Sequence, residues 1–332
     1  MLKKICAITI PVLIAVGILI FMLAGVWDQI GEALASVVPS WPLLLILAGA
    51  LCTGAWFLRG CRYRTILRRL DTSVTVPFST ATIFVSQTAN IIVPARLGDF
   101  VRLFILKHEK QTTYTSGFTT IVAERAYDIL TIALLGLISL PFMITLIPDE
   151  YSWFIWVICA VIIAGIIGII VLILIRNVHS GNKILAKILE IFSQFLQVSS
   201  SPRTFLHLTG QSLVIWMIDV VICWIAGLMF GQSINFFLVL FAVVIGNLVK
   251  AIPITPGGIA TYEAALAIVL TFGGIPAVFA TLIPILDHLI KNLTTIIGGI
   301  VSLIVFGEWS VSLMKRLFKE GKKAAKVDAD EP

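Results

Sequence analysis

The sequence reads Asn90-Ile-Ile-Val-Pro94-Ala-Arg96-Leu-Gly98-Asp99-Phe-Val-Arg102 where a long apolar run is interrupted by proline, glycine and charge. A second interruption of the same kind reads Pro253-Ile-Thr-Pro256-Gly257-Gly258-Ile-Ala-Thr-Tyr262-Glu263. Non-helical backbone and buried charge are costly at membrane depth and are tolerated mainly where they line a cavity or a water-filled path. Two such breaks, one in each half of a chain, are typical of a transporter site built from discontinuous helices.

The composition around these breaks is that of a membrane protein. Of the 332 residues, 59% are hydrophobic and only 13% are charged, which excludes an ordinary soluble domain. Apolar runs of about 20 residues recur along the chain, and each is long enough to span roughly 30 Å of hydrocarbon. A transmembrane barrel would instead show segments of about 10 residues with alternating polarity. We therefore predict an all-α, polytopic integral membrane bundle with re-entrant or broken helices.

The chain divides into a large apolar part and a short polar end. We expect residues 1–315 to form a single transmembrane domain and residues 316–332 to form a cytoplasmic tail that is first basic and then acidic. Because the tail contains few apolar residues, we expect it to be disordered.

The net charge of +6 comes from basic residues that lie between the apolar runs. The clusters are Arg59, Arg62, Arg64, Arg68 and Arg69, and the stretch from Lys315 to Lys326. Two compatible readings are the positive-inside rule and contact with anionic lipid headgroups. We do not expect nucleic-acid binding. Five dispersed cysteines with no CxxC pair, and four dispersed histidines, predict neither a metal site nor a cofactor.

The lysine and arginine distribution places both termini in the cytoplasm of a multi-pass protein of the cell membrane. We expect a first span over residues 5–26, retained rather than cleaved as a signal peptide, and a second over residues 42–58. The Asp28–Glu32 loop between them carries no lysine or arginine and should lie outside. Residues 77–93 contain many hydroxyl and amide side chains and have basic flanks on both sides, which predicts a re-entrant hairpin.

The rest of the chain continues this pattern. We expect apolar segments over residues 116–147, 152–175 and 205–230, an outer loop at Pro148–Glu150, and an amphipathic interfacial helix over residues 184–198. Between residues 234 and 306 the apolar sequence should be broken at Pro253–Gly258, at Gly273–Pro276 and at Pro284.

The two principal breaks also resemble each other. They lie about 160 residues apart, and each follows an apolar run that contains an asparagine, Asn90 or Asn247. Each continues with proline and then with glycine and an acidic residue that opens a new helix. We interpret this as a weak internal repeat, and we predict that the two breaks meet at one shared cavity.

Ionisable residues at membrane depth are candidate functional groups. The richest set is Glu124-Arg125-Ala-Tyr127-Asp128, in which Glu124 and Asp128 share a helical face and Arg125 can pair with Asp128. One reading is an internally compensated ion pair that fixes helix packing. The other is a site where Arg125 holds a phosphate in a bidentate manner.

The residues at the two breaks have a similar pair of readings. Arg96 and Arg102, with Asp99, can meet a lipid phosphate at a helix N-terminus, or they can be topology charges of a cytoplasmic loop. Pro256-Gly257-Gly258 with Tyr262 and Glu263 can form a flexible part of the site, or a simple turn followed by a first-turn acid.

Five further ionisable residues lie in the second half of the chain: Asp219, Lys250, Asp287, His288 and Lys291. Asp287 and Lys291 have the spacing of a helical acid–base pair that neutralises itself. Asp219 is alone in its span and needs a partner, for which Lys250 and Arg125 are the candidates.

Three of these motifs together resemble the signatures of the lysylphosphatidylglycerol synthase transmembrane (flippase-like) family. The motifs are Pro94-x-Arg96-x-Gly98-Asp99-x-x-Arg102, Glu124-Arg125-x-x-Asp128 and Pro256-Gly257-Gly258-Ile-x-x-Tyr262-Glu263, in the family's order. The resemblance implies a polytopic fold with re-entrant elements and a lipid-translocating activity. The chain departs from the pattern at Asp99, where glutamate is usual, and near Asp287-His288, where an arginine is often found. No aminoacyltransferase domain follows in this sequence, so we expect no lysyl transfer.

Three functions remain open from the sequence. The first is a flippase that moves a phospholipid or a lipid-linked headgroup, anionic or phosphate-bearing, across the membrane. The second is a membrane-embedded transferase acting on a lipid-linked substrate, and the third is a non-transporting accessory subunit of a glycolipid or cell-envelope pathway. We expect membrane lipids as partners, and we allow for a homo-oligomer. The expected substrate-binding residues are Arg96, Asp99, Arg102, Glu124, Arg125, Asp128, Pro256, Gly257, Gly258, Tyr262 and Glu263.

Overall fold

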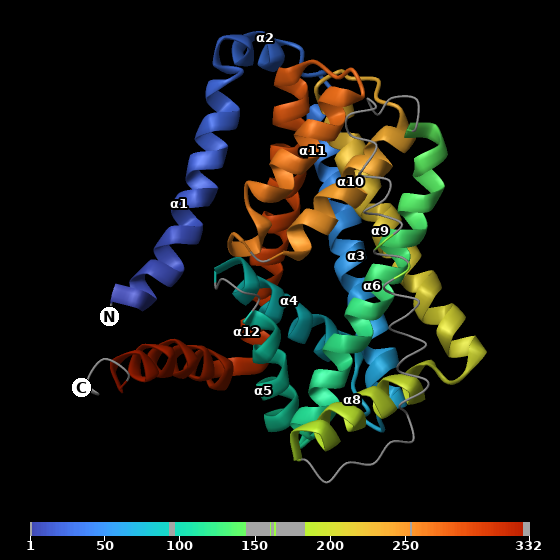
Figure 1. Ribbon diagram of the computed structural model, residues 1–332, viewed down its shortest axis with the longest axis vertical. Coiled ribbons are helices and arrows are strands. Elements are labelled where there is room, and N and C mark those ends of the chain that lie inside the picture. The colour runs from blue at the N-terminus through green and yellow to red at the C-terminus, as the bar shows by residue number, and fades with distance from the viewer. Residues whose placement is uncertain are drawn as a thin grey trace.

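A computed structural model describes residues 2–92, 97–143, 160, 163, 183–252 and 254–327, and in these residues the chain forms helices and no strand (Figure 1). The α-helices are α1 (Leu2–Ala24), α2 (Ile30–Ala35), α3 (Trp41–Arg69), α4 (Val76–Ile92), α5 (Gly98–Lys110), α6 (Tyr114–Met143), α8 (Lys183–Ser199), α9 (Pro202–Met229), α10 (Phe236–Ala251), α11 (Thr261–Phe272) and α12 (Ala277–Val327). Short 3₁₀ turns, η1 (Trp27–Gln29) and η4 (Pro256–Gly258), connect some of them.

Among the residues that the structure describes, four helices are long and apolar enough to cross a membrane: α3, α6, α9 and the Ala277–Ile304 part of α12. The helices Thr9–Ala24 and Trp27–Ala35, bent by 60° where they join, give a fifth span if counted together. Two further apolar segments, Phe236–Ala251 and Pro256–Phe272, are too short to cross. The predicted class, a multi-pass helical bundle with broken helices, is confirmed.

The expected internal repeat is present as a repeated order of helices. Helices α3, α4, α5 and α6 contain 29, 17, 13 and 30 residues. Helices α9, α10 and α11 contain 28, 16 and 12 residues, and the long helix α12 follows them. Each half is therefore a long helix, two short ones and a second long one.

The two halves have opposite orientations. The backbone amide of Val38, just before α3, donates to the carbonyl of Met229 at the end of α9 (3.0 Å). The side-chain amide of Gln197, near the end of α8 and close in sequence to the start of α9, donates to the carbonyl of Arg69 at the end of α3 (3.2 Å). Helices α3 and α9 are therefore antiparallel. They pack along each other, while α4 packs on α12 and α10 packs on α6, so the contacts between the halves are reciprocal. This is the arrangement of an inverted repeat.

The two short helices of each half form a hairpin that returns to the side from which it came. In the first hairpin, the Lys110 ammonium at the end of α5 lies 5.2 Å from the ring centroid of Phe78 at the start of α4. In the second, Gly273 at the end of α11 packs against Leu238 at the start of α10. Figure 1 shows α4 and α5 in the lower half of the bundle and α10 and α11 in the upper half. The hairpin predicted within residues 77–93 is longer than predicted: residues 77–92 belong to one helix, α4, and α5 is the arm that returns.

Gly98 allows the first hairpin to close tightly. A Cβ atom at this position would lie 2.4 Å from the carbonyl oxygen of Ser86 and 2.5 Å from the backbone nitrogen of Asn90, which are backbone atoms that cannot move aside. We expect Gly98→Ala to destabilise the protein by about 1–3 kcal/mol, the usual cost of overpacking. The measurement is the midpoint of thermal unfolding in detergent. Gly54→Ala on α3 is the control, because a Cβ there has no neighbour within 4 Å; equal midpoints for the two variants would contradict this explanation of Gly98.

Two sequence expectations need correction. Pro284 lies inside α12 and does not break it, because membrane helices tolerate proline where neighbouring groups satisfy the freed carbonyl. The second span does not end near residue 58: α3 continues to Arg69, so the arginine cluster belongs to a helix, and two of its members, Arg59 and Arg62, line an internal cavity.

The remaining expectations concern the amphipathic helix, the C-terminal tail and the outer loop. The amphipathic helix expected at residues 184–198 is α8. Helix α12 continues to Val327, through part of the expected tail, whose lysine, alanine and glutamate residues favour helix. The outer loop Pro148–Glu150 and the segment 152–175 lie outside the continuously described residues, as do Pro94, Arg96 and Pro253.

Candidate functional site

A cavity of about 180 Å³ lies between the two halves of the protein. Residues from α3, α4, α6, α9, α10 and α12 line it, together with the second break. Among the described lining residues, five are basic and three acidic, a formal excess of two positive charges. They are Arg59, Arg62, Arg125, Lys250 and Lys291, and Glu124, Asp128 and Asp219.

Arg102 forms the buried centre of the polar network in the first half. Its side chain is fully buried and forms an ion pair with Glu124 of α6, while Asp99 of its own helix lies 3.7 Å away. A buried guanidinium is tolerated only when it is paired, and the carboxylates of Glu124 and Asp99 supply that pairing. Glu124 therefore pairs with Arg102 of the preceding short helix, a partner that the sequence analysis did not assign to it.

Asp99 fastens the tip of the first hairpin. Its carboxylate accepts hydrogen bonds from Asn90 (3.0 Å), Ser86 (3.3 Å) and Gln87 (3.4 Å), all on α4. It also contacts the Arg125 guanidinium at 3.5 Å. Because the donors come from the end of one helix and Asp99 from the start of the next, the carboxylate holds the end of α4 against the start of α5.

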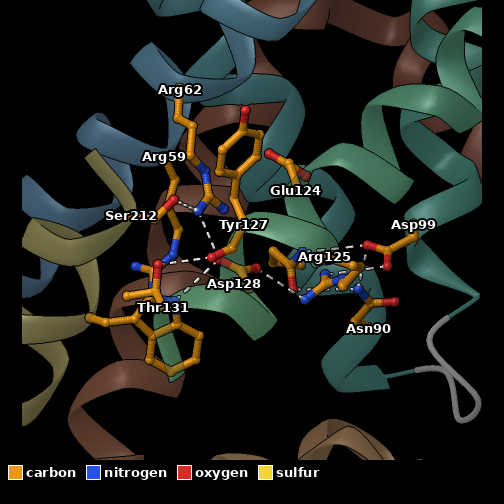
Figure 2. A network of polar contacts seen from close by, with 12 residues as sticks. Arg59, Arg62, Asn90, Asp99, Glu124, Arg125, Tyr127, Asp128, Thr131 and Ser212 are labelled. Atoms are coloured by element: carbon orange, nitrogen blue, oxygen red, sulfur yellow. Dashed lines mark hydrogen bonds and ion pairs between the residues drawn. The ribbon is translucent and has the colours of Figure 1, made fainter. Parts of the chain in front are cut away.

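Asp128 is held mainly by Arg62 of α3. The Arg62 guanidinium lies 2.7 Å from Asp128 Oδ1 and also donates to Ser212 of α9 at 2.7 Å. The Trp216 indole donates to the same carboxylate oxygen at 3.2 Å. Arg62 is almost fully buried and joins three helices, so it is a structural member of the site (Figure 2).

Arg125 is the most loosely held cation of this network. Its guanidinium lies between Asp99 (3.5 Å) and Asp128 (3.6 Å), and its side chain is 35% exposed (Figure 2). Both carboxylates have closer donors, Asn90 for Asp99 and Arg62 for Asp128. Arg125 lines the cavity, and its neighbours remain hydrogen-bonded if it turns toward a ligand.

The partner of Asp219 is Arg59, at 2.7 Å, and not Lys250 or Arg125 as we expected. Arg59 also lies over the Trp56 ring, 4.7 Å from its centroid. The expectation was wrong because it confined Arg59 to a cytoplasmic cluster, whereas the antiparallel packing of α3 on α9 brings the two residues to one level.

The second half has its own polar network on α11 and α12. Asp287 accepts a hydrogen bond from the Tyr262 hydroxyl (2.8 Å) and pairs with Lys291 (2.8 Å), which confirms the predicted acid–base pair. Lys291 also donates to the carbonyl of Asp219 (3.0 Å).

The polar triplets of the two halves correspond. Asp287, His288 and Lys291 on α12 have the same spacing as Glu124, Arg125 and Asp128 on α6, and each lies 163 residues after its counterpart. Each triplet also contacts the first turn of the preceding short helix: Arg125 contacts Asp99, and His288 Nδ1 lies 2.7 Å from Glu263 Oε1. The inverted repeat therefore extends to the chemistry of the site.

The described parts of the two breaks meet, as predicted. A Cβ atom at Gly257 would lie 3.5 Å from the Cα atom of Ile91, and both residues line the cavity. Gly257 and Gly258 have positive φ values of 64° and 76°, which glycine adopts without strain. Ala260 has a φ of 73°, which is strained for a residue with a side chain and is held there by the surrounding turn.

The predicted site residues occupy two layers. Glu124, Arg125, Asp128, Gly257 and Gly258 line the cavity. Behind them lie four residues that contact the lining residues or their neighbours: Asp99, Arg102, Tyr262 and Glu263. Pro256 is buried in the turn. Arg96 lies outside the described residues.

Sequence reasoning did not assign four lining cations to the site: Arg59, Arg62, Lys250 and Lys291. The repeated triplet spacing was a signal for Lys291. For Arg59 and Arg62 the three-residue spacing inside a basic cluster gives no such signal, because the sequence does not distinguish an exposed arginine from a buried one.

Comparison with known proteins finds similarity over most of the chain. The family described as Lysylphosphatidylglycerol synthase TM region matches residues 8–299. The chain is similar to Glycosyltransferase AglD of Haloferax volcanii, with 31% identity over 90% of this chain and 55% of AglD, so it spans about half the length of that relative.

Two further relatives carry less specific names. A UPF0104 membrane protein of Methanocaldococcus jannaschii is 27% identical over 63% of this chain and 90% of its own length. A UPF0104 membrane protein of Methanothermobacter thermautotrophicus is 22% identical over 90% of this chain and 93% of its own length.

Proposed function

This chain belongs to the lysylphosphatidylglycerol synthase TM region family, and from that premise we propose that it is a transporter that moves a phosphate-bearing lipid headgroup across the membrane. We infer that it lies in the cytoplasmic membrane with both termini in the cytoplasm, because lysine and arginine concentrate in the segments assigned to that side. The headgroup would pass through the cavity between the halves while the acyl or prenyl chains stay in lipid.

The position of Arg125 carries the proposal. A guanidinium binds phosphate through two parallel hydrogen bonds, and these are strongest where water is scarce. Arg125 lines the cavity, is partly exposed, and leaves two carboxylates that keep closer donors of their own. It can therefore exchange protein carboxylates for a lipid phosphate without leaving a buried charge unpaired.

The broken helices support the same proposal. Helices α5 and α11 begin at the breaks, and their N-cap residues, Leu97 and Ala260, make no side-chain cap hydrogen bond. Helix N-termini of this kind favour anions, and discontinuous helices provide them at the middle of the membrane in transporters.

The uncharged part of the cavity wall favours a headgroup with hydroxyl groups. Indole and amide side chains supply donors and acceptors there: Trp56, Trp216, Gln87, Asn90, Asn247 and Asn292. Such groups suit the hydroxyls of a sugar or of glycerol next to a phosphate. The name of the relative AglD, a glycosyltransferase, is consistent with a sugar-bearing lipid as one source of this chemistry.

A second reading, a lipid-linked transferase, is favoured only by that relative's name. A transferase needs a general base within reach of its substrate. The carboxylates at the cavity are engaged by cations: Asp128 by Arg62, Asp219 by Arg59 and Glu124 by Arg102. The geometry therefore supports transport better than proton abstraction.

The proposal is tested by reconstituting the protein in phosphatidylcholine vesicles with a trace of fluorescent phosphatidylglycerol and measuring how much dye becomes accessible to an external quencher. We expect phosphatidylglycerol to exchange between leaflets faster than in empty vesicles, and fluorescent phosphatidylcholine, which has no net charge, to exchange less. An excess of a short polyprenyl-phosphoryl hexose, compared with an excess of phosphatidylglycerol, identifies which source competes better. Exchange no faster than in empty vesicles for every lipid would refute the transport proposal, and hexose transfer to lipid without exchange would favour the transferase.

A further inference from the structure

His288 joins an acid and a base deep inside the second half of the protein. Its Nδ1 lies 2.7 Å from Glu263 Oε1, and its Nε2 lies 3.0 Å from the Lys250 ammonium. The ring is 1% exposed and lies against the Tyr262 ring, with 4.8 Å between centroids and an angle of 49° between the ring planes. The chain of contacts therefore runs from Glu263 through His288 to Lys250, which lines the cavity.

The hydrogen bonds determine which ring nitrogen carries the proton. A lysine ammonium only donates hydrogen bonds, so Nε2 of His288 must accept. Nδ1 then carries the hydrogen and donates it to Glu263, and the imidazole is neutral. A proton added to Nε2 would place two donors and two positive charges 3.0 Å apart. The contact between His288 and Lys250 therefore excludes the imidazolium form.

The Lys250 ammonium can also reach the cavity. It lines the cavity, and its stem lies along Gly258, where a Cβ atom would be 2.5 Å from the Lys250 Cγ. Because Gly258 has no side chain, the methylene groups of Lys250 can lie directly against the backbone there. If the ammonium leaves His288, the cavity is the polar volume next to it.

The charged groups around His288 balance one another in the present arrangement. On α11 the ring faces Glu263 and Tyr262, on α10 Lys250, and on its own helix Lys291. Lys291 is in turn matched by Asp287 and, from α9, by Asp219, with Cys223 nearby. Glu263 Oε2 is buried and accepts no hydrogen bond from the residues that the structure describes, so a charged His288 would form an ion pair with an acid that can use it.

The inverted repeat gives an independent reason to single out this residue. His288 occupies the position that corresponds to Arg125, and both contact an acid in the first turn of the preceding short helix. One half therefore has a permanent cation at this position, and the other half has a side chain that becomes a cation only when it binds a proton.

We propose that His288 is a proton-binding site coupled to the headgroup, so that the protein moves one proton with each lipid phosphate. The inference rests on the proposed transport function. A proton from the side to which the cavity is open binds Nε2, and the Lys250 ammonium moves into the cavity, where it meets the phosphate. When the headgroup leaves on the other side, Lys250 returns to Nε2 and the proton departs. The phosphodiester brings one negative charge and the proton one positive charge, so the loaded interior keeps the charge of the empty one.

The test measures protons taken up when lipid binds. Titrating the full chain in detergent with a short-chain phosphatidylglycerol, in two buffers that differ in ionisation enthalpy, gives both the affinity and the proton count. The phosphodiester does not titrate near neutral pH, so the protons come from the protein. We expect uptake approaching one proton per lipid, and an affinity that rises as pH falls, by up to about 10-fold per pH unit, because linkage is reciprocal.

His288→Gln is the matched variant, since glutamine keeps one donor and one acceptor for Glu263 and Lys250 but binds no proton. We expect it to bind lipid with no proton uptake and with an affinity independent of pH. If it does not fold, Lys250→Gln serves instead, because it removes the group whose movement couples the two events and should also abolish uptake.

The outcomes separate the two proposals. Lipid binding by the unmodified protein without proton uptake would overturn the coupling and leave the phosphate site intact. Uptake that persists in His288→Gln would place the proton elsewhere and also overturn it. Failure of the unmodified protein to bind phosphatidylglycerol would refute the phosphate site, and the coupling with it.

Discussion

Replacing Arg125 with glutamine is expected to leave the protein folded and to slow lipid exchange by roughly 10- to 100-fold, the value of a hydrogen bond to a charged group. Folding should survive because Asp99 keeps Asn90 and Asp128 keeps Arg62 when the guanidinium is removed. Exchange should fall because the phosphate loses its bidentate partner at the cavity. The measurement is the rate of leaflet exchange of fluorescent phosphatidylglycerol at equal amounts of reconstituted protein.

Two variants make the Arg125 result specific. Arg125→Lys retains the charge but not the planar fork, and we expect it to exchange lipid poorly as well. Arg68→Gln removes one arginine at an exposed position of the same protein and should exchange lipid at the unmodified rate. If Arg125→Gln exchanged lipid as fast as Arg68→Gln, Arg125 would be part of the scaffold only.

Arg102 should show the opposite behaviour, with a large effect on stability. Arg102→Leu leaves the Glu124 carboxylate buried without its cation, and breaking a buried pair in this way costs about 3–5 kcal/mol. We expect a large drop in the thermal unfolding midpoint of the detergent-solubilised protein, with little folded protein recovered.

The double variant Arg102→Leu with Glu124→Leu distinguishes a lost ion pair from lost packing. Replacing both members of a buried pair by apolar residues is often neutral or stabilising, and Asp99 keeps its contacts with Asn90 and Arg125. We therefore expect the midpoint of the double variant to recover most of the loss. A double variant less stable than Arg102→Leu alone would mean that the pair contributes in another way.

Much of the fold could be predicted because the length of an apolar run and the proline and glycine residues that break a helix are local features of the sequence. The apolar runs predicted the spans, and the motifs around Gly98 and Pro256-Gly257-Gly258 marked the boundaries between short helices. Pro284 was misleading, because whether a proline breaks a membrane helix depends on what packs against the freed carbonyl. The extent of α3 beyond residue 58 was missed for a similar reason: its last turns are polar and are stabilised by α9, which lies far away in sequence.

The candidate site could be predicted only in part. Site residues could be predicted where a charged residue interrupts an apolar run, as at Arg125 and Asp128, but the partners of these residues could not be predicted. Glu124 pairs with Arg102 and Asp219 with Arg59, across 22 and 160 residues of sequence. Such pairings depend on which helices are adjacent, and neither hydropathy nor charge spacing specifies adjacency.

The opposed orientation of the two halves has a consequence for direction. In a molecule made of two interchangeable units, opening toward one face and opening toward the other are the same movement carried out by opposite units. Exchanging their conformations, so that α4 against α12 adopts the fit now seen between α10 and α6, generates the second shape from the first. A molecule of this symmetry does not by itself favour inward or outward movement. A vectorial preference can arise only at positions where the units differ, and Arg125 against His288 is one such position near the proposed path of the headgroup.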